Sequence, residues 1–478
     1  MAIIYDSKPF KERVEGALAD DFKHQAIEAA QDMFQGKRVN IVAGVPAWEE
    51  FRTQAAEIRD HVLSNLDYYL DQFATNAEKA GAKVYFAKDD KEAVDQAIEI
   101  FRQVNAKSCV KSKSMMTEEI GLNHALIDDG VTVYETDLAE MILQLNDWNP
   151  PSHIVVPALH RDRYIIKDLF ADSGYEGSED PMELTHFARR YMRDKFLTAD
   201  VGVTGCNYGI AETGTTTLVT NEGNGRMVTA LPKTQVIFLG MERILPNFEC
   251  LDAIMELFVR ASVGSKITSY FSLSTGPKKA DEVDGPEEQH IIIIDNGRTD
   301  ILKGEFREML RCIRCGACLN ICPVYRHITG HGYGSIYPGP MGAVLTPLLV
   351  GFENAKYLPF ASTLCGACTD HCPVKIPLHE MLLRQRQVIV EELKLMSPIE
   401  GGIFRGAGIG LGNSTIYDLG TKVAAPVMKV LGDGDRLKDN VQIPVLRDWT
   451  SSRDMDLLKS YKFRDWFKDH QKQKGGRK

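Results

Sequence analysis

Seven of the chain's ten cysteines lie in one short region and have the spacing of iron–sulfur ligands. The first group follows the pattern C-x2-C-x2-C-x3-C-P, and the second follows C-x2-C-x3-C-P. The two groups are Cys312, Cys315, Cys318 and Cys322, and Cys365, Cys368 and Cys372. In bacterial ferredoxins with two clusters, the fourth cysteine of such a run binds the other cluster. The spacing therefore predicts two iron–sulfur clusters, whose usual chemistry is the transfer of single electrons.

This cross-ligation rule predicts the ligands of each cluster. Cluster 1 is expected to bind Cys312, Cys315, Cys318 and Cys372, and cluster 2 is expected to bind Cys322, Cys365 and Cys368. A further C-x2-C step before the second group would place a cysteine where Ser362 stands. Cluster 2 is therefore predicted to be either a [3Fe–4S] cluster or a [4Fe–4S] cluster with a weak fourth ligand from Ser362, water or a nearby His. One thiolate fewer removes a negative charge, which should raise its reduction potential.

Structural zinc is the competing interpretation, because zinc also binds sites of four cysteines. Zinc sites usually show paired C-x2-C steps and have no need for a further cysteine at x3 followed by proline, so iron–sulfur clusters are favoured. Four basic residues flank the ligands and would stabilise the reduced clusters if they lie close. They are Arg311, Arg314, Arg326 and Lys375. The three scattered cysteines Cys109, Cys206 and Cys250 are interpreted as small buried apolar residues.

The elements expected around these groups divide the 478 residues into three parts. Residues 1–305 are predicted to form an α/β domain with N-terminal helices, residues 306–395 an all-α ferredoxin-like domain, and residues 396–478 a C-terminal extension. Strands that alternate with helices predict a mostly parallel sheet. The expected strands are 83–87, 108–111, 131–134, 153–157, 215–221, 227–230, 235–240 and 290–295. The expected helices are 47–79, 89–104, 116–127, 137–145, 160–171, 299–311, 342–350 and 377–396.

Composition limits the classes of partner. The formal net charge is −10, which argues against a nucleic-acid interface as the main function. No apolar run is long enough to span a membrane, and the N-terminus has no signal-peptide pattern, so we expect a cytoplasmic protein. The extension contains a glycine-rich stretch, 401–412, that would be flexible if isolated, and an aromatic tail from Arg447 onward. This tail is either a loosely packed end or a segment that docks to a partner subunit.

A glycine- and threonine-rich run over residues 201–226 is the most distinctive sequence outside the cysteines. Glycines and hydroxyls at a strand–helix junction can present backbone N–H groups to an anion. The candidate anion site consists of Gly205, Glu212, Thr213 and Gly214, with Lys111 or Lys113 as the counter-charge. Tight turns around a sheet explain the same run without any ligand.

Four runs together resemble one bacterial family. They are Val110–Ile120, Glu135–Glu140, Pro151–His160 and residues 201–226, in this order and followed by the two cysteine groups. Over nearly the whole chain, this arrangement is similar to the lactate utilisation protein B family. Ala139 stands where glycine is commoner, whereas Ser362 fits the family, which also lacks the eighth cysteine.

The resemblance implies both fold and function. It implies a first domain similar to the sugar-phosphate isomerase and CoA-transferase group, and action with two companion subunits that oxidise L-lactate to pyruvate. We therefore expect an iron–sulfur electron-transfer subunit that passes electrons to a quinone, a flavoprotein or another carrier. It would be cytoplasmic and peripheral to the membrane through partners at most.

Two alternatives remain. The α/β domain could itself bind or transform an anionic substrate, or the subunit could serve glycolate or another 2-hydroxy acid. No catalytic constellation is evident in the sequence. The candidate bases His153, His160, His331 and His371 are better explained as packing or hydrogen-bonding residues.

Overall fold

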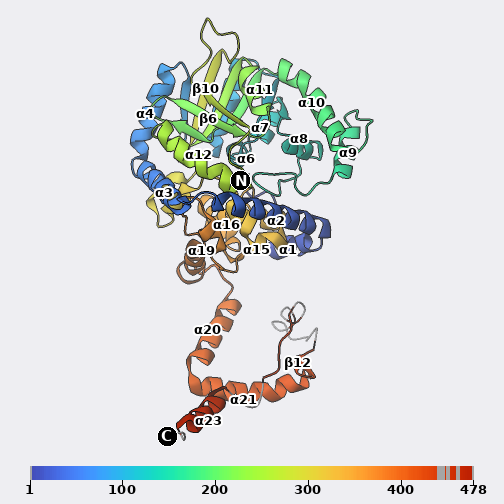
Figure 1. The fold of residues 1–478 in the computed structure, drawn as a ribbon, viewed down its shortest axis with the longest axis vertical. Coiled ribbons are helices and arrows are strands. Elements are labelled where there is room, and N and C mark those ends of the chain that lie inside the picture. Colours follow the sequence, from blue (N-terminus) through green and yellow to red (C-terminus); the bar gives the residue numbers. More distant parts are fainter. Residues whose placement is uncertain (1–2, 439–446, 448–449, 451–452, 459–462, 476–478) are drawn as a thin grey trace. The chain divides into compact units, whose positions relative to one another are not determined.

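The protein is described here by a computed structural model that covers residues 3–438, 447, 450, 453–458 and 463–475 (Figure 1). The chain forms two compact units, Met1–Leu393 and Lys394–Lys478. The first unit contains both the α/β part and the cysteine groups. Among the described helices, none is both long and apolar enough to cross a membrane.

The centre of the first unit is a six-stranded sheet in which every pair of neighbouring strands is parallel, as the sequence predicts. The strand order is β1-β10-β7-β4-β2-β3. The strands are β1 (Lys83–Ala87), β2 (Ser108–Lys111), β3 (Thr132–Glu135), β4 (Val201–Gly205), β7 (Thr234–Gly240) and β10 (Glu288–Ile294). The isoleucine run at the end of β10 is fully buried, because parallel strands are covered on both faces.

Helices cover this sheet, and a second, smaller sheet lies beside it. The second sheet has the order β8-β5-β6-β9, with β5 (Tyr208–Ile210), β6 (Thr215–Thr220), β8 (Ile244–Leu245) and β9 (Tyr270–Ser274). The helices of the α/β part are α3 (Trp48–Ser64), α4 (Leu66–Lys79), α5 (Asp90–Gln103), α6 (Met115–Glu119), α7 (Leu122–Asp128), α8 (Leu138–Leu145), α9 (Arg163–Ala171), α10 (Pro181–Thr198), α11 (Asn224–Ala230) and α12 (Phe248–Val263).

The cysteine-bearing part is helical, as predicted, and it packs on the two N-terminal helices α1 (Phe10–Leu18) and α2 (Asp21–Ala43) (Figure 1). Its elements are α13 (Arg298–Lys303), η1 (Arg307–Arg311), α14 (Ala317–Ile321), α15 (Pro323–Ile328), η2 (His331–Tyr333), α16 (Gly339–Val350), α17 (Phe352–Ala355), η3 (Leu358–Phe360), α18 (Ala367–His371), α19 (Leu378–Gln387) and the π-helix η4 (Val388–Glu392). One apolar core joins buried residues of the N-terminal helices, of α12 and of the cysteine loops. The helices that open the chain therefore help to position the candidate metal ligands.

Two predicted strands are wrong. Residues 153–157 form an irregular buried loop instead of a strand, in which His153 is only 2% exposed and packs toward α14. Residues 227–230 belong to α11, because the backbone of Val228 lies directly over Gly202 of β4. In each segment one apolar residue, Ile154 or Val228, is buried by tertiary contacts without belonging to a strand, whereas Met227 is exposed.

Three predicted helices are interrupted. Residues 47–79 form α3 and α4, which are separated by Asn65 with its non-helical backbone. The predicted helix 116–127 breaks at Gly121, which has a φ of 69°. The predicted helix 299–311 is α13 followed by the 3-10 turn η1, with Gly304 between them.

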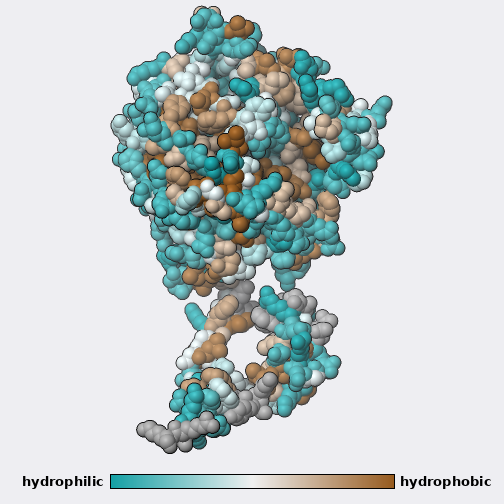
Figure 2. All heavy atoms as spheres, viewed as in Figure 1, coloured by the Kyte–Doolittle hydropathy of each residue, from teal (hydrophilic) through white to brown (hydrophobic). Residues whose placement is uncertain are grey.

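The second unit, taken by itself, contains α20 (Pro398–Gly412), α21 (Ser414–Val430), the short strands β11 (Gly432–Asp433) and β12 (Arg436–Leu437), and α23 (Phe463–Gly475). The glycine-rich stretch is helical in α20, where Phe404 and Leu411 are more than 70% exposed. Figure 2 shows apolar residues along the surface of these helices. Of the predicted aromatic tail, Trp449 lies outside the described residues, whereas Phe463, Trp466 and Phe467 lie on α23 and are exposed.

Candidate iron–sulfur centre and the adjoining cavity

The two cysteine groups share one backbone conformation, although they lie about fifty residues apart. In the first loop Arg314 and Gly316 have φ values of 59° and 77°. In the second loop Leu364 and Gly366 occupy the same positions and have φ values of 56° and 84°. Each loop then enters a five-residue helix, α14 or α18, that ends before the final Cys-Pro. Left-handed backbone at two positions turns the chain tightly, so that side chains of one loop face a common centre.

Ser362 takes the place of a cysteine in this comparison. The Sγ of Cys312 accepts a hydrogen bond from the amide of Arg314 at 3.4 Å. The Oγ of Ser362 accepts one from the amide of Leu364 at 3.0 Å. In both loops, therefore, the amide two residues further along donates to this side chain. The serine oxygen stands where the second loop would otherwise carry its fourth sulfur.

The structure brings the four cysteines of the predicted cluster 1 together. Cys312, Cys315, Cys318 and Cys372 line one small cavity. Its other walls are mostly apolar and include Ile154, Ile313, Met341, Val374, Ile376 and Leu378. The Sγ of Cys372 accepts a hydrogen bond from the amide of Ile376 at 3.4 Å. Four sulfurs in a dry setting with an amide hydrogen bond fit the donor set of an iron–sulfur cluster.

The three cysteines assigned to cluster 2 also interact with one another. Cys322 and Cys365 each raise the pKa of Cys368, after the larger effect of burial, which together bring it to about 12. The Sγ of Cys322 accepts a hydrogen bond from the amide of Tyr325 at 3.4 Å. Unlike the cluster 1 cysteines, Cys365 is exposed to solvent. Cluster 2 therefore has one ligand that is open to solvent, although its other two cysteines are buried.

Burial also disfavours the thiolate form of two cysteines assigned to cluster 1, Cys315 and Cys372. Burial raises the pKa of Cys372 to about 11 and moves that of Cys315 higher still. As free thiols they would stay protonated at neutral pH, so the thiolates depend on a bound cation for stability. Across the described ranges, no three His, Cys, Asp or Glu side chains converge as ligands of a single ion would. A cluster presents a separate iron to each thiolate, so its ligands do not need to meet at one point.

Arginines far away in the sequence hold the carbonyl groups of the cysteine loops. Arg243 donates to the carbonyl oxygens of Cys312 at 2.7 Å and Ile313 at 3.2 Å. Arg52 donates to that of Cys372 at 3.0 Å. Arg59 is fully buried and donates only to backbone carbonyls, among them that of Leu310 at 3.0 Å. A buried cation bonded to neutral carbonyls is costly unless a negative charge lies nearby. The Glu242 carboxylate supplies one such charge, and a thiolate-bound cluster would add another.

Of the basic residues that the sequence singled out, Arg314 lines the cavity of the cluster 1 cysteines, whereas the other three pair with acidic residues. Arg311 pairs with Asp60 at 2.6 Å, Arg326 with Asp32 at 2.8 Å, and Lys375 lies 3.6 Å from Glu49. The acidic partners come from α2 and α3, so these ion pairs fasten the cysteine part to the N-terminal helices. Of the four, Arg314 lies deepest: its guanidinium stands 4.6 Å from the centre of the Tyr337 ring and 3.9 Å from a Glu242 oxygen.

A second candidate site is a cavity of about 390 Å³ at the carboxyl ends of β2, β4 and β7. Parallel sheets usually bind ligands at this edge. Gly205 lines the cavity, but Glu212, Thr213 and Gly214 do not. Gly214 instead packs against α4, where a side chain at its position would meet the backbone of Ala77. The structure therefore does not bring the four predicted anion-site residues together.

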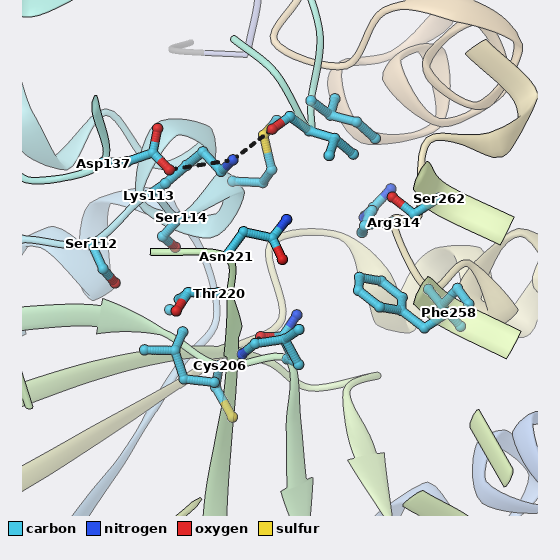
Figure 3. A pocket seen from close by; sticks show the side chains of 18 of the residues that line it. Ser112, Lys113, Ser114, Asp137, Cys206, Thr220, Asn221, Phe258, Ser262 and Arg314 are labelled. Carbon is cyan, nitrogen blue, oxygen red and sulfur yellow. Dashed lines mark hydrogen bonds and ion pairs between the residues drawn. The ribbon is translucent and has the colours of Figure 1, made fainter. Parts of the chain in front are cut away.

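The two lysines proposed as counter-charges of the anion lie in different places. Lys111 is fully buried, and its Nζ lies 2.8 Å from Glu135 and 3.2 Å from Glu118. Lys113 lines the cavity, where its Nζ donates to the carbonyl of Val155 at 2.8 Å and lies 3.7 Å from Asp137 (Figure 3). Lys113 is therefore the lysine of the pair that faces the cavity.

Comparison with known proteins gives the family. Residues 70–294 match the LUD domain, and residues 308–376 match the 4Fe-4S dicluster domain. Proteins named "Lactate utilization protein B" are 48% identical in Bacillus licheniformis and 51% identical in Shouchella clausii, each over 99% of both chains. The chain belongs to the lactate utilization protein B family. A solved DUF162 family protein from Deinococcus radiodurans is 14% identical and covers 48% of this chain and 98% of its own, but its TM-score of 0.26 is too low to support an argument.

Membership of this family supports iron–sulfur clusters over zinc at the cysteine loops. The family resemblance drawn from the sequence is thereby confirmed, as is the α/β fold of the first part.

None of the four candidate histidine bases lines the cavity at the sheet edge, although His153 lies beside residues that do. Nε2 of His153 bonds to Asn320 at 3.1 Å, and its Nδ1 accepts from the amide of Val155 at 3.0 Å. Burial lowers the pKa of His153 and of His331 to about 4. These two, with His160 and His371, are absent from the walls of that cavity. Each is therefore explained by packing.

The three cysteines outside the groups are not brought to the ligands. Cys109 is buried in β2, and burial raises its pKa to about 12. Cys206 lines the larger cavity, and burial raises its pKa to about 12 as well. Both thiols are protonated at neutral pH.

Proposed function

We propose that this protein is the iron–sulfur electron-transfer subunit of a complex that oxidises L-lactate to pyruvate. One observation carries the proposal: seven cysteines with the spacing of two-cluster ferredoxins gather as four and three on matching loops. The names of the relatives support a role in lactate utilisation. When bound, the clusters would supply one-electron transfer between a donor and an acceptor.

The chain's own residues would hold and tune these groups. In this proposal Cys312, Cys315, Cys318 and Cys372 hold cluster 1, while Cys322, Cys365 and Cys368 hold cluster 2. Ser362 would be the weak fourth ligand of a [4Fe–4S] cluster 2, and loss of the iron ion that it holds would give the [3Fe–4S] form. Arg59 and Arg243 would compensate the negative charge of cluster 1 when it is bound.

Companion subunits and an electron acceptor, a quinone or a flavoprotein, complete the proposal. The second unit supports partner docking, because α20 and α21 expose large apolar residues and α23 exposes three aromatic ones. Aromatic and apolar residues are typical of interface cores. The complex would lie in the cytoplasm, with any contact to the membrane made through partners.

The test compares the isolated chain with the assembled complex. The purified chain, with clusters reconstituted, should not oxidise L-lactate with an artificial acceptor, whereas the full complex should reduce both clusters on addition of L-lactate. Oxidation by the chain alone would contradict a pure relay. Growth of a deletion strain on L-lactate and on glycolate separates the proposed substrate from the rival 2-hydroxy acid.

A further inference from the structure

The cavity at the carboxyl edge of the sheet is not needed to hold the clusters, yet it lies directly beside one of them. Ile154, Ile313 and Arg314 line both this cavity and the smaller one formed by Cys312, Cys315, Cys318 and Cys372. A single layer of side chains therefore separates the two spaces. A small molecule bound in the cavity at the sheet edge would therefore lie next to cluster 1.

The size and position of the cavity suit a ligand. Its volume of about 390 Å³ falls in the range of small-molecule sites, which is about 300–1,000 Å³. The walls come from several elements, as at ligand sites of other parallel sheets. Figure 3 shows Ser112, Ser114, Lys113 and Asp137 on one side of the cavity and Arg314, Ser262 and Phe258 on the other.

One polar group of the wall lacks a partner. The hydroxyl of Ser112 is buried without any hydrogen bond, and the residue is only 1% exposed. A buried hydroxyl without a partner costs about 1–3 kcal/mol. Ser112 lines the cavity (Figure 3), so a ligand that hydrogen-bonds to it would remove this cost.

The charges of the wall indicate the chemistry of the ligand. Lys113 and Arg314 are cationic groups on opposite sides of the cavity, and each can attract a carboxylate. Asp137 and Glu242, which also line the wall, lie 3.7 Å from Lys113 and 3.9 Å from Arg314. Glu222 also lines the cavity, and its Oε2 accepts from the amide of Leu138 at 3.1 Å. Burial, with a smaller effect of Asp137, raises the pKa of Glu222 to about 7. A carboxyl group that is half protonated at neutral pH can donate to an oxo group or accept from a hydroxyl.

We propose that this cavity binds a small hydroxycarboxylate or its oxo product, with Lys113 and Ser112 as the principal contacts. The inference rests on the proposed function, since a ligand that can give up electrons belongs beside an electron carrier. It goes further by giving the α/β part of this chain a binding site for the acid beside cluster 1, whereas the oxidation itself would still need the companion subunits.

Calorimetric titration of the purified full-length chain, with its clusters reconstituted, tests the site. The probes are L-lactate, pyruvate and propionate, which has the carboxylate without the hydroxyl or oxo group. L-lactate and pyruvate should bind about tenfold more tightly than propionate, because only they can use the second set of polar contacts. The EPR signal of cluster 1 should shift when either binds.

Two variants locate the binding. Lys113→Met should weaken L-lactate and pyruvate about tenfold or more, and Ser112→Ala, which needs no change in backbone or charge, should weaken both by several-fold. Lys91→Met is the matched control, because Lys91 is an exposed lysine of α5, and it should bind as the unaltered chain does. Iron content should be equal in all forms.

Absence of binding to the full-length chain would overturn the proposal. Binding that is unchanged in both Lys113→Met and Ser112→Ala would also overturn it, because the ligand would then lie elsewhere. The relay function is judged separately, by the reduction of the clusters in the assembled complex. A chain that relays electrons but binds neither acid would thus refute the cavity site alone.

Discussion

The two cysteine loops have the same backbone but different surroundings. Both turn through two left-handed residues and a short helix, yet the first carries Cys312 where the second carries Ser362. Three cysteines of the first loop, together with Cys372 of the second, face an apolar cavity near buried arginines, whereas Cys365 of the second loop is open to solvent. After Pro323 the chain continues as α15, but after Pro373 it turns at Lys375, whose φ is 49°. A duplicated loop can therefore carry two electronically distinct clusters, because ligand charge and solvent access both set the potential.

Removal of one cysteine ligand of cluster 2 should have the largest effect, because it should abolish a whole cluster. Cys368→Ala is expected to lose cluster 2 and keep cluster 1, so about four of about eight irons should remain if both clusters are cubes. Iron analysis and EPR measure this. Cys206→Ala, which changes a half-buried thiol outside the loops, is the matched control and should keep all its iron. Full iron content in Cys368→Ala would refute the ligand assignment.

Exchange of the one differing ligand should shift the potentials in opposite directions. Ser362→Cys places a fourth thiolate in the second loop, and the added negative charge should lower the potential of cluster 2. A charge about 4 Å away at an effective dielectric of about 20 is worth about 4 kcal/mol, or about 0.2 V at most. Redox titration followed by EPR reports the shift. Cys312→Ser should raise the potential of cluster 1, and equal potentials before and after either exchange would mean that ligand charge is not the difference.

The buried arginines should account for a smaller part of the difference in reduction potential between the two clusters. Arg59→Met removes a cation from the vicinity of Cys312 and should lower the potential of cluster 1 by tens of millivolts, up to about 0.1 V. Arg59→Lys keeps the charge and should keep most of the potential, which separates charge from packing. Arg326→Met is the control: it lies near Cys322 in sequence, but its charge is already paired with Asp32 and Glu28, so a smaller shift is expected. Equal shifts in Arg59→Met and Arg326→Met would contradict the assignment.

Chelation should remove the second cluster first. Cys365 is exposed, and the second loop lacks one thiolate, so iron at that end can be reached and released more easily. Treatment with a chelator under mild oxidation, followed by EPR, should show cluster 2 decaying several-fold faster than cluster 1. The spectrum of Cys368→Ala identifies which signal belongs to cluster 1. Simultaneous loss of both signals would show that access does not distinguish the loops.

The smallest expected difference between the loops is in the stability lost when the equivalent glycines, Gly316 and Gly366, are replaced. Gly316 and Gly366 both have positive φ, so alanine at either position costs about 1–2 kcal/mol of backbone strain. A Cβ at Gly316 would also stand 3.1 Å from the side chain of Val155, whereas one at Gly366 has open space. Gly316→Ala should therefore destabilise the protein more than Gly366→Ala does. Thermal unfolding with clusters intact measures the difference, and a larger loss at Gly366 would contradict it.

The sequence determined the features that depend on local spacing. The Cys patterns place ligands on tight loops because residues three and four apart can face one centre, and they marked Ser362 as the differing position. Alternation of strands and helices predicted the parallel sheet for the same reason: hydrophobic periodicity is a local property. It failed at residues 153–157 and 227–230, which are short apolar runs in a loop and a helix, because such runs do not by themselves distinguish a strand from other structure.

Only the tertiary structure decided which distant residues surround the clusters. Arg59 and Arg243 reach the first cysteine loop from positions many residues earlier in the chain, and no local pattern marks an arginine whose partners are backbone carbonyls. The basic residues next to the cysteines in sequence are instead mostly paired with acids of α2 and α3. The wall shared by the two cavities likewise exists because a loop, a strand edge and a cysteine turn meet in space. Burial and charge compensation are properties of the packed chain, so they are fixed only when it folds.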